Sequence, residues 1–536
     1  MPFERQELFL TEEDKRQGFW VQDDVHLPYP FTPLYACFQT IAMKEGTLRA
    51  FETIRAPMKQ FYTKIENGYL YQWTKPYEGD LQQRLEEHKR FSGERFSRLK
   101  VILDDYVQTE FLPFYKKLDT FRRTSFTREQ AKEQLLQLHQ FYIRAWELHF
   151  EIVMPRSPLL FALEDLYGQL TKAKDPTVIY EWYVGVMNKT LETDREIGRL
   201  AKRVKESEEL TDLFKETAVE NLLEQLQTIE TGQSFLTELD SFLEVYGYRA
   251  THSHEFVAET WIEDPTPVLG VIAQYVEKDV DFDTEFAKLV EKRRAKFEAA
   301  VKTFPEGELK ETFLQLYQWA LDSWGLDEDH HFYIDAMLPA KSRLFLMAVG
   351  ELLVREGAFE QANDICFLYL DEVLGLLDQP VPSKELITER KREWEENKKK
   401  KPIPFYGEPP QGHDPVLERI FGTRAPEVEK TSIKGYAASQ GVYTGKVRMI
   451  RSPADFSSVQ QGEVLVCRTT TPTWTTLFSV VGAVVTDAGG ILSHAATVAR
   501  EYELPAVVGT KVATTMLQDG QTVTVDGTQG LVLIHE

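Results

Sequence analysis

The sequence predicts a multidomain protein: a mostly α-helical N-terminal body with a small β-hairpin, then a small domain of short strands and one helix. Its 536 residues exceed what one ordinary hydrophobic core serves, so two or more domains are expected. Apolar residues recur at helical spacing in the N-terminal part, whereas short β-branched runs bounded by Gly, Asp or Pro dominate the C-terminal part. We therefore expect a body over 1–401, a linker over 402–433 and a C-terminal domain over 434–536.

Composition argues against membrane and nucleic-acid partners. Hydrophobic residues make up 42% and charged residues 27%, as in ordinary globular proteins, and no run approaches the roughly 18 apolar residues of a membrane helix. The net charge of −23 disfavours nucleic acid. Cys37, Cys366 and Cys467 match no zinc or disulfide spacing, and the first ten residues show no apolar signal segment. We expect a cytoplasmic protein.

The body is expected to be helical because its apolar residues follow helical periodicity. The clearest case is 127–153, where Thr127 and Gln130 form a capping-box pattern ahead of the apolar stripe. Similar patterns cover 80–118, 208–230, 283–303 and 341–356. The exception is a predicted hairpin, with strands at 57–64 and 69–75 around Asn67-Gly68.

A charged helix over 385–401 leads into a Pro- and Gly-rich connector, which marks the predicted linker. The domain after it contains one predicted helix, 493–502, among short strands. The predicted strands are 442–450, 463–467, 483–486, 506–508, 522–525 and 531–534.

The run VTDAGGILSHAATVAREYELPAVVG, residues 485–509, carries the most chemical information. After a buried strand, Gly489-Gly490 forms a tight turn that lets a ligand approach the backbone closely. Ser493 is a natural N-cap, which places His494 in the first turn of a helix. Unpaired N–H groups and the helix dipole favour a phosphate there, and an imidazole can attack phosphorus. Taken alone, a histidine after a Gly-Gly turn is more often a cap or a core residue.

The whole run resembles the phosphohistidine domain of the phosphoenolpyruvate-utilising enzymes, a family that includes phosphoenolpyruvate synthase, pyruvate phosphate dikinase and rifampin phosphotransferase. Two flanking segments, 435–447 and 469–478, resemble the same domain. The residues that carry the main pattern are Thr486, Asp487, Gly489, Gly490, Ser493, His494, Ala495, Ala496, Ala499, Arg500, Glu501, Pro505, Ala506, Val507, Val508 and Gly509.

The resemblance implies that the C-terminal domain is a β/β/α swivelling domain whose His494 is phosphorylated. Gly489, Gly490 and Ser493 would bind the phosphate, and Thr469 and Thr470 could add hydroxyl donors, although ordinary turn threonines are equally expected. Thr473 and Tyr248 stand where the family often has an acid and a histidine.

The order of the chain resembles rifampin phosphotransferase without its ATP-binding domain, or the histidine-bearing subunit of a phenylphosphate synthase-like enzyme. The sequence before residue 430 shows neither a P-loop nor the strand-helix rhythm of a (β/α)₈ barrel. The resemblance therefore implies a dikinase-type phosphotransferase component. A separate ATP-grasp partner would phosphorylate His494, which would pass the group to a small phenol- or alcohol-like hydroxyl. Mg²⁺ is expected with ATP, mainly on the partner, and no metal ligand is predicted in this chain.

Two segments of the body offer candidates for the acceptor site. An acceptor hydroxyl must lose a proton as it attacks phosphorus, and positive charge helps the transferring oxygens. On a helix His331 and Asp335 share a face, which fits a base with an orienting carboxylate; a solvated charged helix or a satisfied buried histidine is the alternative. Pro339 is expected to bend or end that helix. The candidates are Arg249, His252 and His254, then His331, Asp335, Lys341 and Arg343, with His330 beside them.

Other functions fit parts of the pattern. A phosphoenolpyruvate synthase-like component would need a pyruvate site from another chain. A non-catalytic phosphohistidine carrier or regulator would use the body as a docking surface. A scaffold without chemistry would not require the glycines, Ser493 and His494 together.

Overall fold

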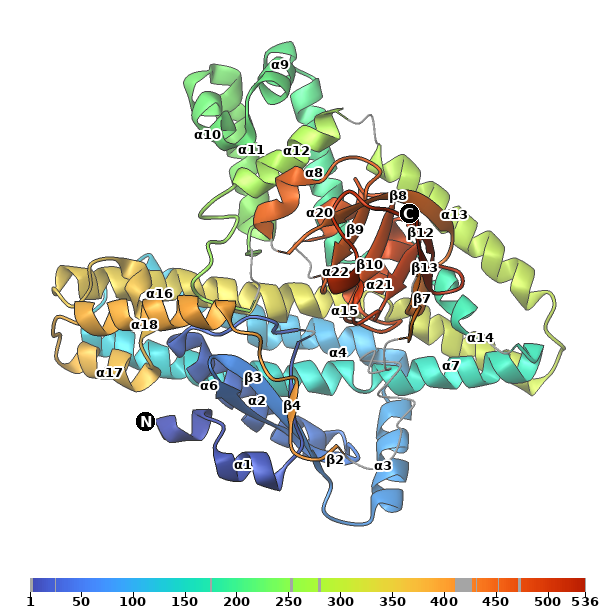
Figure 1. Ribbon diagram of the computed structural model, residues 1–536, viewed down its shortest axis with the longest axis horizontal. Helices are drawn as coiled ribbons and strands as arrows, with labels where there is room; N and C mark the ends of the chain where they lie inside the picture. The colour runs from blue at the N-terminus through green and yellow to red at the C-terminus, as the bar shows by residue number, and fades with distance from the viewer. Residues whose placement is uncertain are drawn as a thin grey trace. The chain divides into compact units, whose positions relative to one another are not determined.

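The computed structural model describes residues 3–24, 26–173, 176–250, 254–277, 281–409, 427–429, 431–451, 453–470 and 474–535. The chain separates into two compact units (Figure 1). Unit 1 comprises 1–176, 254–258 and 305–411, and unit 2 comprises 177–253, 259–304 and 412–536. No helix in the described ranges combines the length and the apolar character that a bilayer crossing needs.

Unit 1 is mostly helical. Its α-helices are α1 (Glu12–Gln17), α2 (Pro33–Thr53), α3 (Leu81–Gly93), α4 (Leu99–Tyr106), α5 (Leu112–Arg122), α6 (Arg128–Val153), α7 (Arg156–Thr171), α14 (Glu308–Asp322), α15 (Leu326–His330), α16 (Met337–Arg355), α17 (Leu370–Asp378) and α18 (Lys384–Lys399). Shorter 3₁₀ segments are η1 (Arg5–Leu8), η2 (Phe96–Arg98) and η6 (Ala362–Phe367), and two π-helical segments are η3 (Val107–Phe111) and η5 (His331–Ala336).

The predicted hairpin forms, as β2 (Met58–Glu66) and β3 (Tyr69–Pro76). Asn67 and Gly68 both take positive φ, the conformation that a two-residue hairpin turn requires. The sheet packs against α2, and α6 packs on the same helix (Figure 1). The capping box at Thr127 begins α6 as predicted: Thr127 Oγ1 accepts from Gln130 N and Gln130 Oε1 accepts from Thr127 N.

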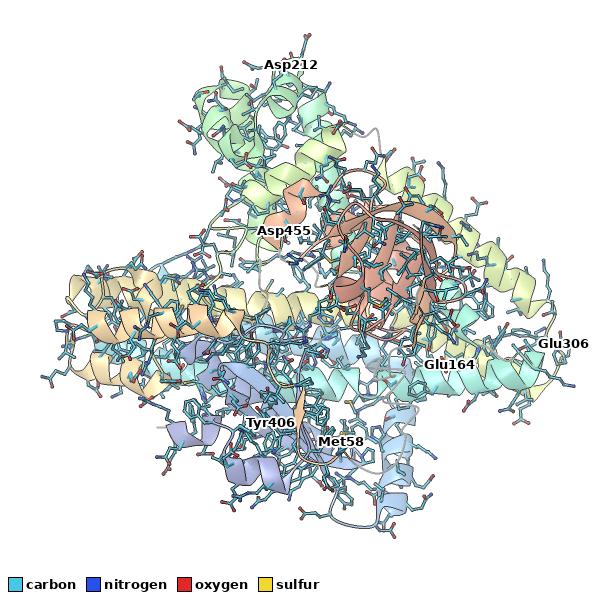
Figure 2. All side chains as sticks on the ribbon, viewed as in Figure 1. Met58, Glu164, Asp212, Glu306, Tyr406 and Asp455 are labelled. Carbon is cyan, nitrogen blue, oxygen red and sulfur yellow. The ribbon has the colours of Figure 1, made fainter. Side chains whose placement is uncertain are left out.

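The predicted linker is structured at both of its described ends. Strand β4 (Phe405–Tyr406) pairs with β1 (Trp20–Gln22), which gives unit 1 a sheet of order β2-β3-β1-β4. Tyr71 Oη donates to the Ile403 carbonyl at 2.8 Å, and Tyr406 Oη bonds to Glu66. Figure 2 labels Tyr406 beside this sheet. The other end forms strands of unit 2, and 410–426, the middle of the predicted linker, lies outside the described residues.

The helix that carries the predicted His331–Asp335 pair does not end at Pro339. The π segment η5 continues directly into α16, and Pro339 lies in the first turn of α16. A proline removes one helical hydrogen bond, and here that loss coincides with the interruption of the regular α pattern. Lys341 and Arg343 therefore lie on the same continuous helical segment as His331.

Unit 2 joins a helical part to the C-terminal domain. The helical part comprises η4 (Thr177–Trp182), α8 (Lys189–Lys205), α9 (Glu208–Glu216), α10 (Val219–Thr228), α11 (Glu230–Tyr246), α12 (Thr266–Glu277) and α13 (Phe282–Val301), with Asp212 of α9 labelled in Figure 2. The predicted body, 1–401, is thus divided differently: 177–253 and 259–304 cluster with the C-terminal domain. They do so because α8 and the segment before it contact the C-terminal end of α21 (His494–Glu501), which is distant in sequence.

The C-terminal domain is built on a nine-stranded arrangement with the order β5-β6-β13-β12-β8-β9-β10-β11-β7. The strands are β5 (Glu427–Glu429), β6 (Ser432–Lys434), β7 (Tyr436–Ser439), β8 (Val442–Met449), β9 (Val464–Cys467), β10 (Ala483–Thr486), β11 (Ala506–Val508), β12 (Thr522–Asp526) and β13 (Leu531–Ile534). The segments between them are η7 (Pro453–Ser458), α20 (Thr475–Phe478), α21 (His494–Glu501) and α22 (Ala513–Met516).

Alternate side chains of the central strands build two separate cores. Leu465, Val484 and Val508 pack with the apolar face of α21. Val464 and Val485, one position away, point to the opposite core with β12 and β13. This period-two alternation fixes the register of the sheet, because a one-residue slip would exchange the two faces. The parallel strands β8 to β11 end at one edge, and His494 follows β10 there.

We predict opposite effects for two helical glycine substitutions in unit 1. A Cβ at Gly350 would meet the Ala362 carbonyl oxygen at 2.2 Å, whereas one at Gly375 would meet no atom within 4 Å. Gly350→Ala should therefore lower the free energy of unfolding by about 1–3 kcal/mol or more. Gly375→Ala should raise it by up to about 1 kcal/mol, because alanine is the better helix former. Urea denaturation measures both, and a destabilised Gly375→Ala together with an unaffected Gly350→Ala would contradict this packing.

Candidate functional site

His494 is the first residue of α21, at the end of a tight turn from β10. Ser493 is the N-cap, as predicted, and its Oγ accepts from Ala496 N at 3.4 Å. Ser493 N donates to the Gly490 carbonyl at 3.1 Å, which closes the turn before the helix. The half-buried His494 side chain therefore stands at a helix N-terminus, where N–H groups lack intrahelical partners and the dipole favours an anion.

Gly489 is required by the geometry of this turn. Its φ is +101°, and a Cβ there would lie 2.8 Å from Ser493 Oγ and 2.9 Å from Ser493 Cβ. Gly509 takes φ +69°, and a Cβ on it would meet the Gly489 carbonyl oxygen at 2.7 Å. Both glycines of the recognised pattern thus allow a close backbone approach that a side chain would prevent.

Asp487 ties the turn to the loop after β11. Its carboxylate accepts from Thr510 Oγ1 at 2.9 Å and from Thr514 N at 3.2 Å, and it also bonds to Thr514 Oγ1. The aspartate therefore positions the loop. Thr469 and Thr470 follow β9 at the same edge of the sheet, because β9 and β10 are parallel with Cys467 opposite Thr486. The Thr470 Oγ1 atom is buried and has no hydrogen-bond partner among the described residues.

The C-terminal end of α21 contacts the helical part of unit 2. Glu501 Oε2 accepts from Gly185 N at 2.7 Å, and Tyr502 Oη bonds to Asp194 on α8. Arg500 lies over the Tyr180 ring at 5.3 Å. These polar contacts explain why 177–253 and 259–304 cluster with the C-terminal domain.

Unit 1 contains a group of imidazoles around the buried Asp335, of which His149 and His330 are buried and His331 is partly exposed. Asp335 Oδ2 lies 2.8 Å from His331 Nδ1, so the predicted i,i+4 pair exists. His330 Nε2 lies 3.8 Å from Asp335 Oδ2, and His149 Nδ1 on α6 lies 3.5 Å from Asp335 Oδ1. Residues five apart do not share a face in a regular α-helix, but the π turn of η5 brings both His330 and His331 to one carboxylate.

The imidazoles of this group differ in charge. Burial alone would lower the pKa of His331, but Asp335 outweighs it and raises that pKa to about 9. Burial lowers the pKa of His254 to about 4, although Asp335 acts in the opposite direction. At neutral pH His331 is thus an imidazolium and His254 a neutral imidazole. The general-base role suggested for His331 by the sequence therefore suits His254 better, whereas His331 supplies a cation.

The other predicted acceptor residues are held by structural contacts. Arg249 belongs to unit 2, where it donates to Thr193 Oγ1 at 3.0 Å and lies over the Trp261 ring. Lys341 pairs with Asp119. Arg343 donates to the Phe256 carbonyl at 2.7 Å and to Asn363 Oδ1 at 2.9 Å, so it fixes the segment that carries His254. His252 and Thr473 lie outside the described residues.

Two buried residues of unit 1, His149 beside Asp335 and Glu255 next to His254 in the sequence, were not predicted as site residues. His149 lies on the apolar stripe of α6, where a histidine is usually a core residue, and no local pattern relates it to Asp335. Glu255 is buried and accepts from Thr32 N at 2.8 Å and from Thr32 Oγ1 at 2.7 Å. Burial nevertheless raises its pKa to about 7.

Comparison with known proteins agrees with the geometry around His494. Residues 149–328 match the rifampicin phosphotransferase fourth domain, and residues 459–530 match the mobile domain of PEP-utilising enzymes. The second match contains His494 and the whole turn before it. The C-terminal domain is thus similar to the mobile domain of PEP-utilising enzymes. The resemblance to PEP-utilising enzymes that the sequence indicated is confirmed.

The relatives that the chain matches are longer than the chain itself. It is 36% identical to an uncharacterized phosphotransferase, YvkC, of Bacillus subtilis (strain 168), over 99% of this chain and 63% of that protein. Rifampicin phosphotransferase of Bacillus cereus is 26% identical over 58% of this chain and 36% of that protein. A probable phosphoenolpyruvate synthase of Archaeoglobus fulgidus is 50% identical over 19% of this chain and 14% of that protein. The chain spans less than two thirds of each.

We predict that Glu255 makes the stability of unit 1 depend on pH. Its folded-state pKa of about 7 lies above the value of 4.5 expected when unfolded. Its contribution to stability is thus fully present below about pH 4.5 and is lost as pH rises through about 7, by an amount of order 3 kcal/mol. Urea denaturation between pH 5 and pH 8 should show a shallower pH dependence in Glu255→Gln than in wild type. Exposed Glu385→Gln is the control, and identical pH dependence in all three proteins would contradict the assignment.

Proposed function

We propose that this chain is the phosphohistidine- and acceptor-bearing component of a dikinase-type phosphotransferase. His494 receives a phosphoryl group from ATP held by a separate ATP-grasp protein or domain. It then transfers the group to a hydroxyl of a small phenol- or alcohol-like molecule. The observation that carries the proposal is the position of His494, at the first turn of α21 and within the match to the PEP-utilising mobile domain.

The first half-reaction uses the imidazole as nucleophile. A His494 nitrogen attacks the β-phosphorus of ATP, so an N–P bond forms and the P–O bond to the leaving AMP breaks. Water then cleaves the terminal phosphoryl group of the bound pyrophosphoryl group, which releases inorganic phosphate and leaves one phosphoryl group on His494. The helix N-terminus and the backbone near Gly489 and Gly490 favour the added negative charge. Mg²⁺ accompanies ATP in this half-reaction and is held mainly by the partner.

The second half-reaction breaks the N–P bond and forms a P–O ester. The acceptor hydroxyl loses its proton to a base as its oxygen attacks phosphorus, and the imidazole leaves. The group around Asp335 supports an acceptor site, because it combines the neutral His254 with the cationic His331. A domain that serves two reaction centres must move between them, so we propose that the C-terminal domain swivels on the segment within 402–433.

The proposed class of acceptor rests on the names of the relatives and on the share of this chain that each of them matches. The similarity to a rifampicin phosphotransferase covers 58% of this chain and therefore reaches beyond the mobile domain. The similarity to a probable phosphoenolpyruvate synthase covers only 19%. A hydroxyl acceptor is accordingly favoured over pyruvate. The alternative is a phosphohistidine carrier that transfers its phosphoryl group to no small molecule.

The first prediction concerns phosphorylation of His494. With ATP labelled at the β-phosphate, Mg²⁺ and a purified ATP-grasp partner, the chain should acquire acid-labile, base-stable label. His494→Ala should acquire none, while His535→Ala, an exposed histidine of the same domain, should label normally. Label on His494→Ala would overturn the assignment of the carrier. Label without any partner would overturn the two-component arrangement.

The second prediction separates the acceptor site from the carrier. His331→Gln should label at His494 as wild type does, but transfer from the phosphorylated protein to a responsive phenol or alcohol should fall by on the order of 100-fold. His88→Gln is the matched control, because His88 is a buried histidine of unit 1 that bonds to the Ile54 carbonyl. Equal transfer by both variants would exclude the group around Asp335. Phosphohistidine that resists every hydroxyl compound would favour a carrier.

A further inference from the structure

The group around Asp335 has the donor set of a metal site. His149, His330 and Asp335 each offer one ligand atom, and these atoms lie within 4.8 Å of one another. They come from three elements, α6, α15 and η5, and their side chains are 9%, 3% and 6% exposed. Two imidazoles and one carboxylate are a common ligand set for zinc and other divalent transition metals.

Two buried atoms of this group face each other within ion-pair distance but without a hydrogen bond. His149 Nδ1 and Asp335 Oδ1 lie 3.5 Å apart, yet neither makes a hydrogen bond to any described residue. Buried polar atoms without hydrogen bonds are destabilising, more so when a group is charged, so a native structure that contains them calls for an explanation. A cation between the two atoms would satisfy both at once.

The third ligand already has the required tautomer. His330 Nδ1 lies 3.0 Å from the Leu326 carbonyl, which can only accept a hydrogen bond. Nδ1 therefore carries the hydrogen, and Nε2 presents its lone pair toward Asp335. Hydrogen bonding of the other ring nitrogen to a carbonyl is the usual outer-shell arrangement of a metal-bound histidine.

The carboxylate can serve the ion and its neighbour together. Oδ2 of Asp335 holds His331 Nδ1 at 2.8 Å, while Oδ1 faces His149. In a tetrahedron with bonds of about 2.0–2.2 Å, ligand atoms lie roughly 3.3–3.6 Å apart. The distance of 3.5 Å between His149 Nδ1 and Asp335 Oδ1 already fits. His330 Nε2 lies 3.8 Å from the other oxygen, Oδ2, and all three ligand atoms lie within 4.8 Å of one another, so His330 would have to approach the ion.

We propose that His149, His330 and Asp335 bind one divalent transition-metal ion, of which Zn²⁺ is the representative. This departs from the expectation, drawn from the sequence, that the chain has no metal ligands. Three protein ligands leave one tetrahedral position open, as in catalytic rather than structural zinc sites. A hydroxyl bound at that position would lose its proton more easily. That last step rests on the proposed function, whereas metal binding itself does not.

The test uses untagged full-length protein, stripped of metal and titrated with Co²⁺ and Zn²⁺ in the absence of ATP. We expect one ion per chain at micromolar protein, with the intense visible absorption of low-coordinate Co²⁺, and bleaching of that absorption by Zn²⁺. His149→Gln and Asp335→Asn should weaken binding about 100-fold or more, because losing an outer-shell partner alone costs 10- to 100-fold. His88→Gln should bind as wild type.

Several outcomes would overturn the proposal. These are no stoichiometric binding to wild type, weak absorption typical of octahedral Co²⁺ on surface carboxylates, or equal affinity in His149→Gln and Asp335→Asn. If either variant fails to fold, X-ray absorption of the wild-type complex decides, since it must show two imidazoles and one carboxylate. The readout needs no phosphoryl transfer. Failure of metal binding is thus distinguishable from failure of His494 to become phosphorylated.

Discussion

The turn between β10 and α21 is the constraint on which the proposed chemistry depends. Gly489 and Gly509 let two backbone segments approach each other, and Asp487 anchors the turn to the loop after β11. Ser493 then starts the helix so that His494 occupies its first position. A phosphoryl group on that imidazole would face the backbone N–H groups of the helix N-terminus, which favour its negative charge.

In unit 1 the comparable constraint is the carboxylate of Asp335. One carboxylate faces three imidazoles from two different parts of the chain, and it keeps His331 charged while His254 stays neutral. Arg343 contributes indirectly, since it binds the Phe256 carbonyl and so fixes the segment that carries His254. The acceptor chemistry and the metal proposal both depend on this carboxylate, but each uses a different oxygen. Oδ2 holds the cationic His331, and Oδ1 faces His149 and would bind the metal.

The sequence predicted what depends on local pattern. The hairpin at Asn67-Gly68, the capping box at Thr127 and the N-cap at Ser493 each require only a few neighbouring residues, and the His331–Asp335 pair requires one helix turn. The π turn that brings His330 to the same carboxylate has no local signature, and His149 reaches it only through packing of α6. The association of 177–253 and 259–304 with the C-terminal domain likewise rests on contacts between distant segments, such as Tyr502 with Asp194.

The most direct test of the central claim is to locate the phosphoryl group by mass spectrometry. The phosphorylated protein would be digested at neutral to basic pH, where a phosphoramidate survives, and fragmented by electron transfer. The account predicts a single phosphoryl group on the imidazole of His494, in the peptide that also contains Ser493. A phosphoryl group on Ser493, on Thr470 or on a histidine of unit 1, with His494 unmodified, would contradict it.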